Sequence, residues 1–182
     1  MVNYRRVRSP GAVYFFTVTL RDRRSDLLVR EINGLRDAWR AARSRVPHTI
    51  VASVILPEHL HAILRMHDDV ADYPRFWRDL KRGFTCALPE RQTSSPWQPR
   101  YWEHVIRDEN DLRGHIDYVH INPMKHDLVS RVVEWPHSSF HRYVREKKVP
   151  ADWGGTVDES WRCGERCPRR ASRPGLHPHK PS

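Results

Sequence analysis

Residues 49–66 read TIVASVILPEHLHAILRM and contain two apolar runs of eight residues on either side of Pro57 and Glu58. The first run, at 49–56, is rich in β-branched side chains, which favour a strand. Proline fixes φ at a value that suits a turn and cannot continue a hydrogen-bonded ladder, so Pro57 and Glu58 should form a tight turn. We therefore predict a β-hairpin in which the second run, at 59–66, pairs with the first.

A strand and a helix precede this hairpin. Residues 13–20, VYFFTVTL, are aromatic and β-branched with no Gly or Pro, which is typical of a buried strand. Apolar residues then recur at spacings of three and four, as on one side of an amphipathic helix that ends before Pro47. These residues are Ile32, Leu35, Trp39, Ala42 and Val46.

A second helix and a fourth strand follow the hairpin. Pro74 suits the first turn of a helix, and the run YWEHVIRD at 101–108 has the composition of a strand. The apolar positions of the predicted helix are Phe76, Trp77, Leu80, Phe84 and Leu88.

The chain then returns to helices. Asp108 or Asn110 can cap a helix that we expect to run until Pro123 stops it. A short helix at 138–144, with Ser138 as its cap, is expected beyond it.

The predicted order of elements is therefore β-α-β-β-α-β-α. Two β-α-β halves of this kind pack as an α+β, ferredoxin-like fold, an antiparallel four-stranded sheet with helices on one face, here with an added C-terminal helix. We assign residues 1–155 to this one domain. Residues 156–182 are Pro-rich, basic and without apolar periodicity, so we expect a disordered tail.

The net charge of +10 over 182 residues is concentrated at the two ends. Residues 1–30 hold seven Arg against two Asp, and residues 162–182 hold six Lys or Arg against one Glu. Such ends favour a polyanionic partner such as nucleic acid, and an ordinary basic surface with an adhesive tail explains the charge equally well. Three Cys and the absence of a long apolar run indicate neither a disulfide framework nor a membrane span, so we expect a cytoplasmic protein.

A His-x-His pair lies on the second strand of the predicted hairpin. Side chains alternate along a strand, so Leu60 and Leu64 should face the helices, while His59 and His61 lie together on the other face. Two neutral imidazoles this close can share a divalent cation. Spacing alone leaves two ordinary strand histidines as the more frequent outcome.

The helix after the fourth strand carries a second group of polar residues. At about 100° per residue, Asp111, His115, Tyr118 and Asn122 form a stripe beside the apolar one. Tyr118 and Asn122 are one turn apart and project together. A half-buried tyrosine with its hydroxyl in water explains this pattern as well.

Taken together, these motifs resemble the REP-associated tyrosine transposases, relatives of single-tyrosine insertion-sequence transposases in the HUH nuclease superfamily. HUH denotes two histidines around a hydrophobic residue. The resemblance covers about residues 1–155 and is carried by NYRR (3–6), GAVYFFTVTL (11–20), LPEHLHAI (56–63), WQPRYWEHVIRDENDL (97–112), DYVHINPMKHDLV (117–129), WPHSSFHRYV (135–144) and DWGG (152–155).

The resemblance implies a mechanism and a set of site residues. His59 and His61 occupy the HUH pair, Tyr118 the position of the nucleophile, and Asn122 that of a third metal ligand, with Mg²⁺ or Mn²⁺ as the metal. The implied substrate is a single-stranded DNA hairpin of a palindromic repeat, cut and rejoined through a covalent 5′-phosphotyrosine. A bacterial, nucleoid-associated monomer or homodimer is expected.

Further residues are candidates for DNA contact. The basic arm with Tyr4, Arg5 and Arg6 suits stacking on bases and pairing with phosphates, or is a frayed terminus. A second candidate is a basic helix face that would bind the stem of the DNA hairpin. Its charges are explained as well by ordinary contact with solvent, and its residues are Arg75, Arg78, Lys81 and Arg82.

Other groups are weaker candidates. Glu103 and His104 are adjacent on a strand, so they should point to opposite faces and favour structural roles. The spacing of Cys163 and Cys167 with His177 and His179 is poor for zinc.

Two further function classes remain open at this point. One is a DNA-hairpin binding protein that has lost catalysis. The other is a zinc hydrolase that uses His59 and His61 with an acidic ligand and a base such as Glu58. The second class would have no need of Tyr118.

Overall fold

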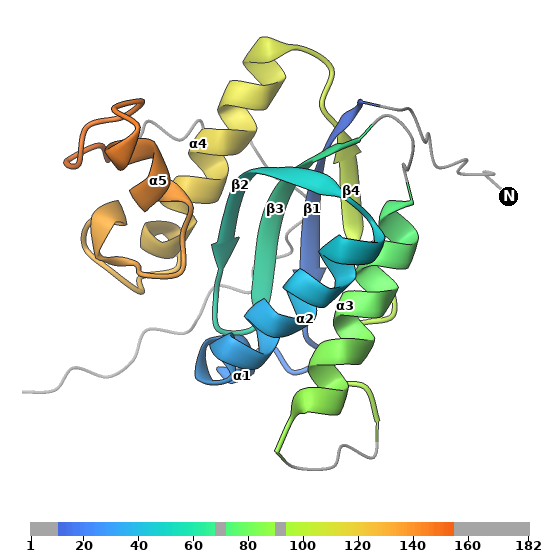
Figure 1. The fold of residues 1–182 in the computed structure, drawn as a ribbon. Helices are drawn as coiled ribbons and strands as arrows, with labels where there is room; N and C mark the ends of the chain where they lie inside the picture. Colours follow the sequence, from blue (N-terminus) through green and yellow to red (C-terminus); the bar gives the residue numbers. More distant parts are fainter. Residues whose placement is uncertain (1–10, 68–71, 90–93, 155–182) are drawn as a thin grey trace, which may run out of the picture.

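The computed structural model describes residues 11–67, 72–89 and 94–154, and its centre is a four-stranded antiparallel sheet (Figure 1). The strands are β1 (Val13–Thr19), β2 (His48–Ile55), β3 (His59–Met66) and β4 (Trp102–Val105), in the order β2-β3-β1-β4. This is the ferredoxin-like topology that the order of elements predicts. Strand β4 is shorter than expected and ends at Val105 rather than at residue 108.

The predicted hairpin is confirmed, and its turn is held from several sides. The Leu56 N–H donates to the His59 carbonyl at 2.8 Å, which closes the turn over Pro57 and Glu58. The Leu20 N–H donates to the Glu58 carbonyl at 2.8 Å, so the end of β1 fixes the turn as well. The start of β3 is therefore a rigid position in the fold.

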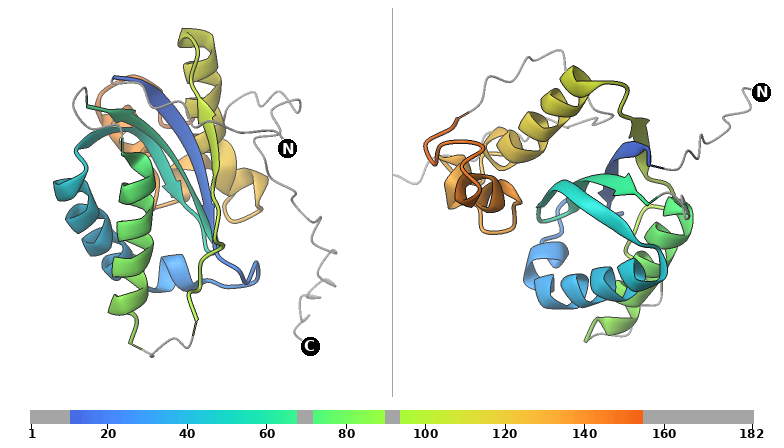
Figure 2. Two further views of the ribbon diagram at one scale, coloured as in Figure 1. Left: turned by 90° about the vertical axis from the view of Figure 1, so that its right-hand side faces the viewer. Right: turned by 45° about the horizontal axis from the view of Figure 1, so that its top comes forward.

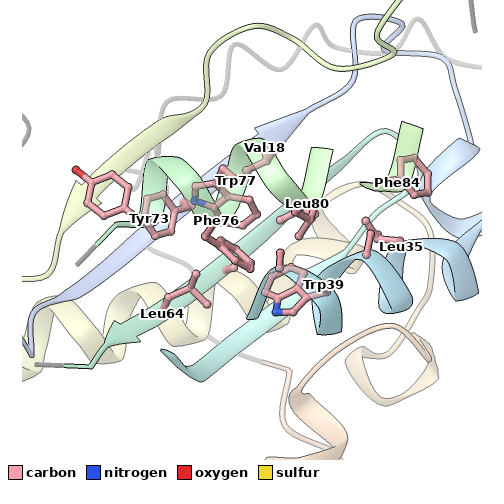
Figure 3. Packing of buried hydrophobic residues seen from close by; sticks show 14 of the residues in the cluster. Val18, Leu35, Trp39, Leu64, Tyr73, Phe76, Trp77, Leu80 and Phe84 are labelled. Carbon is pink, nitrogen blue, oxygen red and sulfur yellow. The ribbon is translucent and has the colours of Figure 1, made fainter. Parts of the chain in front are cut away.

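Two long helices cover one face of the sheet. They are α2 (Ile32–Arg45), preceded by the single turn α1 (Leu27–Arg30), and α3 (Tyr73–Ala87). The main core lies between them and the strands, as Figure 3 shows for nine labelled residues. Because side chains alternate along a strand, Leu60, Ala62 and Leu64 of β3 face this core as the sequence predicts.

A separate layer covers the opposite face. Helix α4 (Glu109–Lys125) packs there against β2 and β3, and it is followed by the 3₁₀ turn η1 (Val132–Glu134) and α5 (Phe140–Arg145) (Figure 2). A second apolar cluster fills this interface, with Phe15 and Ile63 from the sheet against Tyr118 and Val119 from α4. The sheet is thus covered on both faces, whereas the expected pair of β-α-β halves covers only one.

The ends of α4 correct one expectation and confirm another. The Asp108 side chain accepts from the Asp111 N–H at 2.9 Å, so Asp108 is the cap. Pro123 does not stop the helix, which continues to Lys125. A proline removes one N–H, and in the last turn this costs a single intrahelical bond rather than the whole ladder. The helix is closed instead after His126, where Asp127 adopts a left-handed φ of 54°.

The last helix differs slightly from its prediction. Helix α5 begins one residue later than Ser138 allows, and Ser139 occupies its N-cap position. The Ser138 hydroxyl still accepts from the Phe140 N–H at 3.1 Å. Among the described residues, no helix combines the length and apolar character needed to cross a membrane.

Candidate active site

His59 and His61 lie together on the α4 face of the sheet, where strand alternation predicts them. Both side chains are fully buried, and their ring centroids are 4.9 Å apart. They line the interface between the sheet and α4, not the main core.

Each imidazole is oriented by a neighbour through its Nδ1 atom. The Glu58 carboxylate lies 3.1 Å from Nδ1 of His59, and the Thr17 hydroxyl lies 2.9 Å from Nδ1 of His61. Thr17 faces His61 directly across the β1–β3 ladder, so sheet register provides this contact. In the tautomer in which Nδ1 carries the proton toward these oxygens, Nε2 is the ring atom with a lone pair for a ligand. Metal binding in this tautomer would use Nε2.

Helix α4 presents a polar stripe to this pair. The Tyr118 ring lies 5.3 Å from the His61 ring, and the His126 ring lies 5.1 Å from the His59 ring. Asn122 is one helical turn from each of these two residues, so it lies between them opposite the histidine pair. Sequence periodicity predicts Tyr118 and Asn122, while His126 falls beyond the expected end of the helix.

Asn122 is the most informative residue of this stripe. Its side chain is 1% exposed, and within the described part of the chain neither its Oδ1 nor its Nδ2 atom has a hydrogen-bond partner. An amide buried without partners costs about 1–3 kcal/mol, and a bound ion, an ordered water or a catalytic role explains why such a group is kept. Two imidazole nitrogens and an amide oxygen suit a divalent cation, and the residues present therefore fit one.

Two charged side chains also lie at the site, and one of them, Lys125, is not apparent from the sequence. The Lys125 ammonium lies 4.8 Å from the centroid of the Tyr118 ring, one face of which it covers. Burial alone would raise the pKa of Glu58, but the hydrogen bond and charge of His59, together with Arg23, lower it. Glu58 is thus an ionised carboxylate that is engaged with His59.

The basic face of α3 lies on the other side of the sheet. Arg78 and Arg82 are exposed, beside a cleft of about 640 Å³ that is also lined by Trp97 and Tyr101. Lys81 is different because its ammonium donates to the Gln98 carbonyl at 2.8 Å, and burial lowers its pKa to about 8. The structure does not bring this face together with the histidine pair, since α3 and α4 cover opposite faces (Figure 2).

Ion pairs occupy part of this face. Asp79 of α3 lies 3.5 Å from Arg78 and 3.8 Å from Arg75. Arg82 is therefore the residue of the set with the most direct access to a polyanion on the described surface.

The remaining candidates divide into two groups. Glu103 and His104 point to opposite faces as expected: Glu103 accepts from the Tyr73 hydroxyl at 3.4 Å, while His104 lies 2.8 Å from Asp111 on the α4 side. The other group lies outside the described residues: Tyr4, Arg5, Arg6, Cys163, Cys167, His177, His179 and the tail at 156–182.

Comparison with known proteins defines the class of protein. No protein-family model matches the chain. The REP-associated tyrosine transposase of Escherichia coli (strain K12) is 43% identical over 166 residues, which cover 91% of this chain and 98% of that protein. A relative from Haemophilus influenzae, named for the same kind of transposase, is 40% identical over 169 residues, which cover 87% and 96% of the two chains.

A solved structure agrees with these relatives. It is a REP-associated tyrosine transposase bound to a REP hairpin, and it is similar to this chain with a TM-score of 0.83 and 43% identity, over 92% of this chain and 99% of that one. The similar proteins are thus transposases that match this chain along nearly its whole length. This chain belongs to the family of REP-associated tyrosine transposases, and it is a transposase enzyme.

Proposed function

We propose that this protein cuts and rejoins single-stranded DNA at REP-type palindromic hairpins through a covalent bond to Tyr118. Its relative of known structure is bound to a REP hairpin, which supports this class of substrate. The observation that carries the proposal is the arrangement of Tyr118 against His61, one helical turn from a buried Asn122 whose amide has no partner among the described residues.

In this proposal Tyr118 is the nucleophile. Its phenol oxygen attacks phosphorus, a new bond joins the tyrosine to the 5′ phosphate, and the bond from phosphorus to the 3′ oxygen breaks. The phenol proton is lost as the attack proceeds, and the departing 3′ oxygen gains a proton to become a hydroxyl. Because the phosphotyrosine retains the energy of the ester, a 3′ hydroxyl can attack it in the reverse sense and join two strands.

His59, His61 and Asn122 would hold Mg²⁺ or Mn²⁺ beside the reacting phosphate. Such a cation, when bound, neutralises negative charge on a non-bridging phosphate oxygen. Glu58 and Thr17, which lie at the two Nδ1 atoms, would favour the tautomer that presents Nε2 to the cation. The Lys125 ammonium at the Tyr118 ring favours the negative charge that develops on the phenol oxygen.

The hairpin would contact more than one surface. Arg82 and Arg78 are suited to contacting phosphates of the hairpin stem. Lys81 would instead hold the loop at Gln98, to whose carbonyl it donates. Because this face and the histidine pair lie on opposite sides of the sheet, the DNA must pass around a sheet edge to reach both. The basic arm with Tyr4, Arg5 and Arg6 would supply further contacts.

The remaining parts of the proposal concern organisation. We assign the transposase domain to residues 1–155, with 156–182 as a basic tail that adds nonspecific attraction to DNA. The protein would act in the bacterial cytoplasm at the nucleoid, as a monomer or a homodimer.

The alternatives are less consistent with the site. A zinc hydrolase would need Glu58 as a base, yet this carboxylate is engaged with His59, lies 3.7 Å from Arg23, and has a lowered pKa. A protein that only binds hairpins would gain nothing from keeping Asn122 buried at a cost in stability.

The experiment compares Tyr118→Phe with Tyr143→Phe in the full-length chain. Tyr143 is another buried tyrosine. Its hydroxyl donates to the Val51 carbonyl at 3.1 Å, and this contact does not involve the histidine pair. With a labelled REP hairpin and Mg²⁺, we expect Tyr118→Phe to lose cleavage and keep hairpin affinity within about twofold, because it removes one oxygen and little packing surface. Tyr143→Phe should cleave normally. Cleavage at the wild-type rate by Tyr118→Phe would overturn the proposal.

A further inference from the structure

A second cluster of metal-binding residue types lies where β4 meets the start of α4. His104 is on β4, and Asp111 and His115 are on the first turns of α4. One ligand atom from each residue lies within 4.8 Å of the ligand atoms of the other two. Among the described residues, this is the group of at least three His, Cys, Asp or Glu side chains whose ligand atoms lie this close together. None of the three belongs to the candidate active site described above.

The carboxylate of Asp111 lies between the two imidazoles. Its Oδ2 atom is 2.8 Å from Nε2 of His104, and its Oδ1 atom is 3.0 Å from Nδ1 of His115. A tetrahedral cation with bonds of about 2.0–2.2 Å to N and O holds such atoms about 3.3 Å apart. The two distances from the carboxylate to the rings are thus ~0.3–0.5 Å shorter than this value, and all three ligand atoms lie within 4.8 Å of one another.

The three side chains are held in place by contacts outside the cluster. The Arg107 N–H donates to Oδ2 of Asp111 at 2.9 Å. The His104 ring stacks on the His115 ring with centroids 4.7 Å apart, and the centroid of the Phe15 ring lies 4.8 Å from that of His115. A ligand set that is already ordered loses little entropy when a cation binds.

The residue types agree with a ligand set. Two imidazoles and one carboxylate are donors that bind transition metals. One contact competes with binding, because Nδ1 of His115 also lies 2.8 Å from the Asp111 carbonyl oxygen.

We propose that His104, Asp111 and His115 form a second cation site, distinct from the histidine pair, that takes Zn²⁺ or a similar transition metal and braces α4 against β4. Two imidazoles and one carboxylate are donors that suit Zn²⁺ and Co²⁺, whereas Mg²⁺ prefers oxygen ligands. Bracing follows from the position of the ligands, which join an edge strand to the helix that carries Tyr118. Phe15 contacts both His115 and Tyr118, so this brace also steadies the tyrosine.

The test is a Co²⁺ titration of the full-length protein, followed by visible absorption. Nitrogen and oxygen ligands give d–d bands, whereas thiolates from Cys163 or Cys167 would add a charge-transfer band in the near ultraviolet, so sites in the tail are recognised separately. The variants are His104→Gln and, as the matched control, His67→Gln, an exposed histidine on the segment after β3.

The compared quantity is the number of Co²⁺ equivalents that give d–d bands without a thiolate band. We expect this number to be one lower in His104→Gln than in wild type, and unchanged in His67→Gln. In a His59→Gln, His61→Gln background one such equivalent should remain, and Zn²⁺ should raise the melting temperature in this background but not after His104→Gln is added. Equal stoichiometry in wild type and His104→Gln would overturn the proposal, even if the double-histidine background fails to fold. Mg²⁺-dependent hairpin cleavage by wild type is measured separately and tests the proposed function alone.

Discussion

Asn122 shows at the scale of one residue why a buried polar group points to function. Its amide is 1% exposed, and none of its polar atoms has a partner among the described residues. Folding gains nothing from such a group, because the amide gives up its hydrogen bonds to water without replacement. A bound cation would supply the missing partner.

This view predicts opposite effects on stability and activity for Asn122→Leu. The change keeps the branched shape and the number of heavy atoms and removes the unsatisfied amide, so the free energy of unfolding should rise by about 1 kcal/mol. Hairpin cleavage should be lost, and Mn²⁺ affinity should fall. Urea unfolding and Mn²⁺ titration check the two effects, with Asn110→Leu, at an exposed residue of the same helix, as a control. A destabilised Asn122→Leu that still cleaves would mean that the amide has a structural role.

At the scale of elements, the closure of α4 determines where the polar stripe ends. The helix passes through Pro123 and stops after His126, where the Asp127 N–H donates to the Met124 carbonyl at 3.0 Å. Asp127 has a φ of 54°, in the left-handed region that favours glycine. Lys147 has a φ of 56° just after α5.

Asp127→Gly and Lys147→Gly should therefore each stabilise the protein. Glycine relieves the strain of the left-handed backbone, which raises the free energy of unfolding by about 0.5–1 kcal/mol per site. The greater conformational entropy of glycine in the unfolded chain offsets part of this gain. Thermal melts of both variants measure this, and Asp127→Val should melt lower than wild type. A drop in stability for both glycine variants would show that the side chains matter more than the backbone.

Strand pattern and turn chemistry predict the elements around His59 and His61, because both act within a few residues. Pro57 and Glu58 define a turn, and alternation then fixes which face each histidine occupies. The expectation that Pro123 ends α4 was wrong. A proline in the last turn removes only one backbone hydrogen bond, and this loss is too small to end the helix. Thr17 and Lys125 are found only in the structure, because they reach the site through sheet register and through the extension of α4.

The His104, Asp111 and His115 cluster illustrates the same limit. Periodicity places Asp111 and His115 on one stripe of the helix, but His104 joins them only because β4 and α4 meet in the tertiary fold. Spacing along the chain cannot show such a contact.

For the whole molecule, two buried histidines should make folding sensitive to acid. Burial lowers the pKa of His48 and of His120 to about 4, from 6.5. His48 packs against Phe76 in the main core, and His120 packs against Phe140 at the start of α5. As the pH falls, the unfolded chain takes up these protons first, so stability that is present above pH 6.5 is lost towards pH 4.

The expected loss between pH 7 and pH 5 is about 2 kcal/mol for each histidine. Urea unfolding at these two values measures it. His120→Gln should unfold with a smaller difference between the two pH values than wild type does. Identical pH dependence in the variant and in wild type would show that His120 is not titrating in this range.

If Tyr118 is the nucleophile, it becomes covalently joined to DNA, and the joined residue can be mapped. The full-length protein is incubated with a REP hairpin and Mg²⁺, the DNA is trimmed with nuclease, and tryptic peptides are analysed by mass spectrometry. The peptide spanning residues 114–125 contains a single tyrosine, Tyr118. We predict a nucleotide phosphate on this tyrosine. Cleavage with no adduct on this peptide, or with the adduct on another residue, would show that Tyr118 is not the nucleophile.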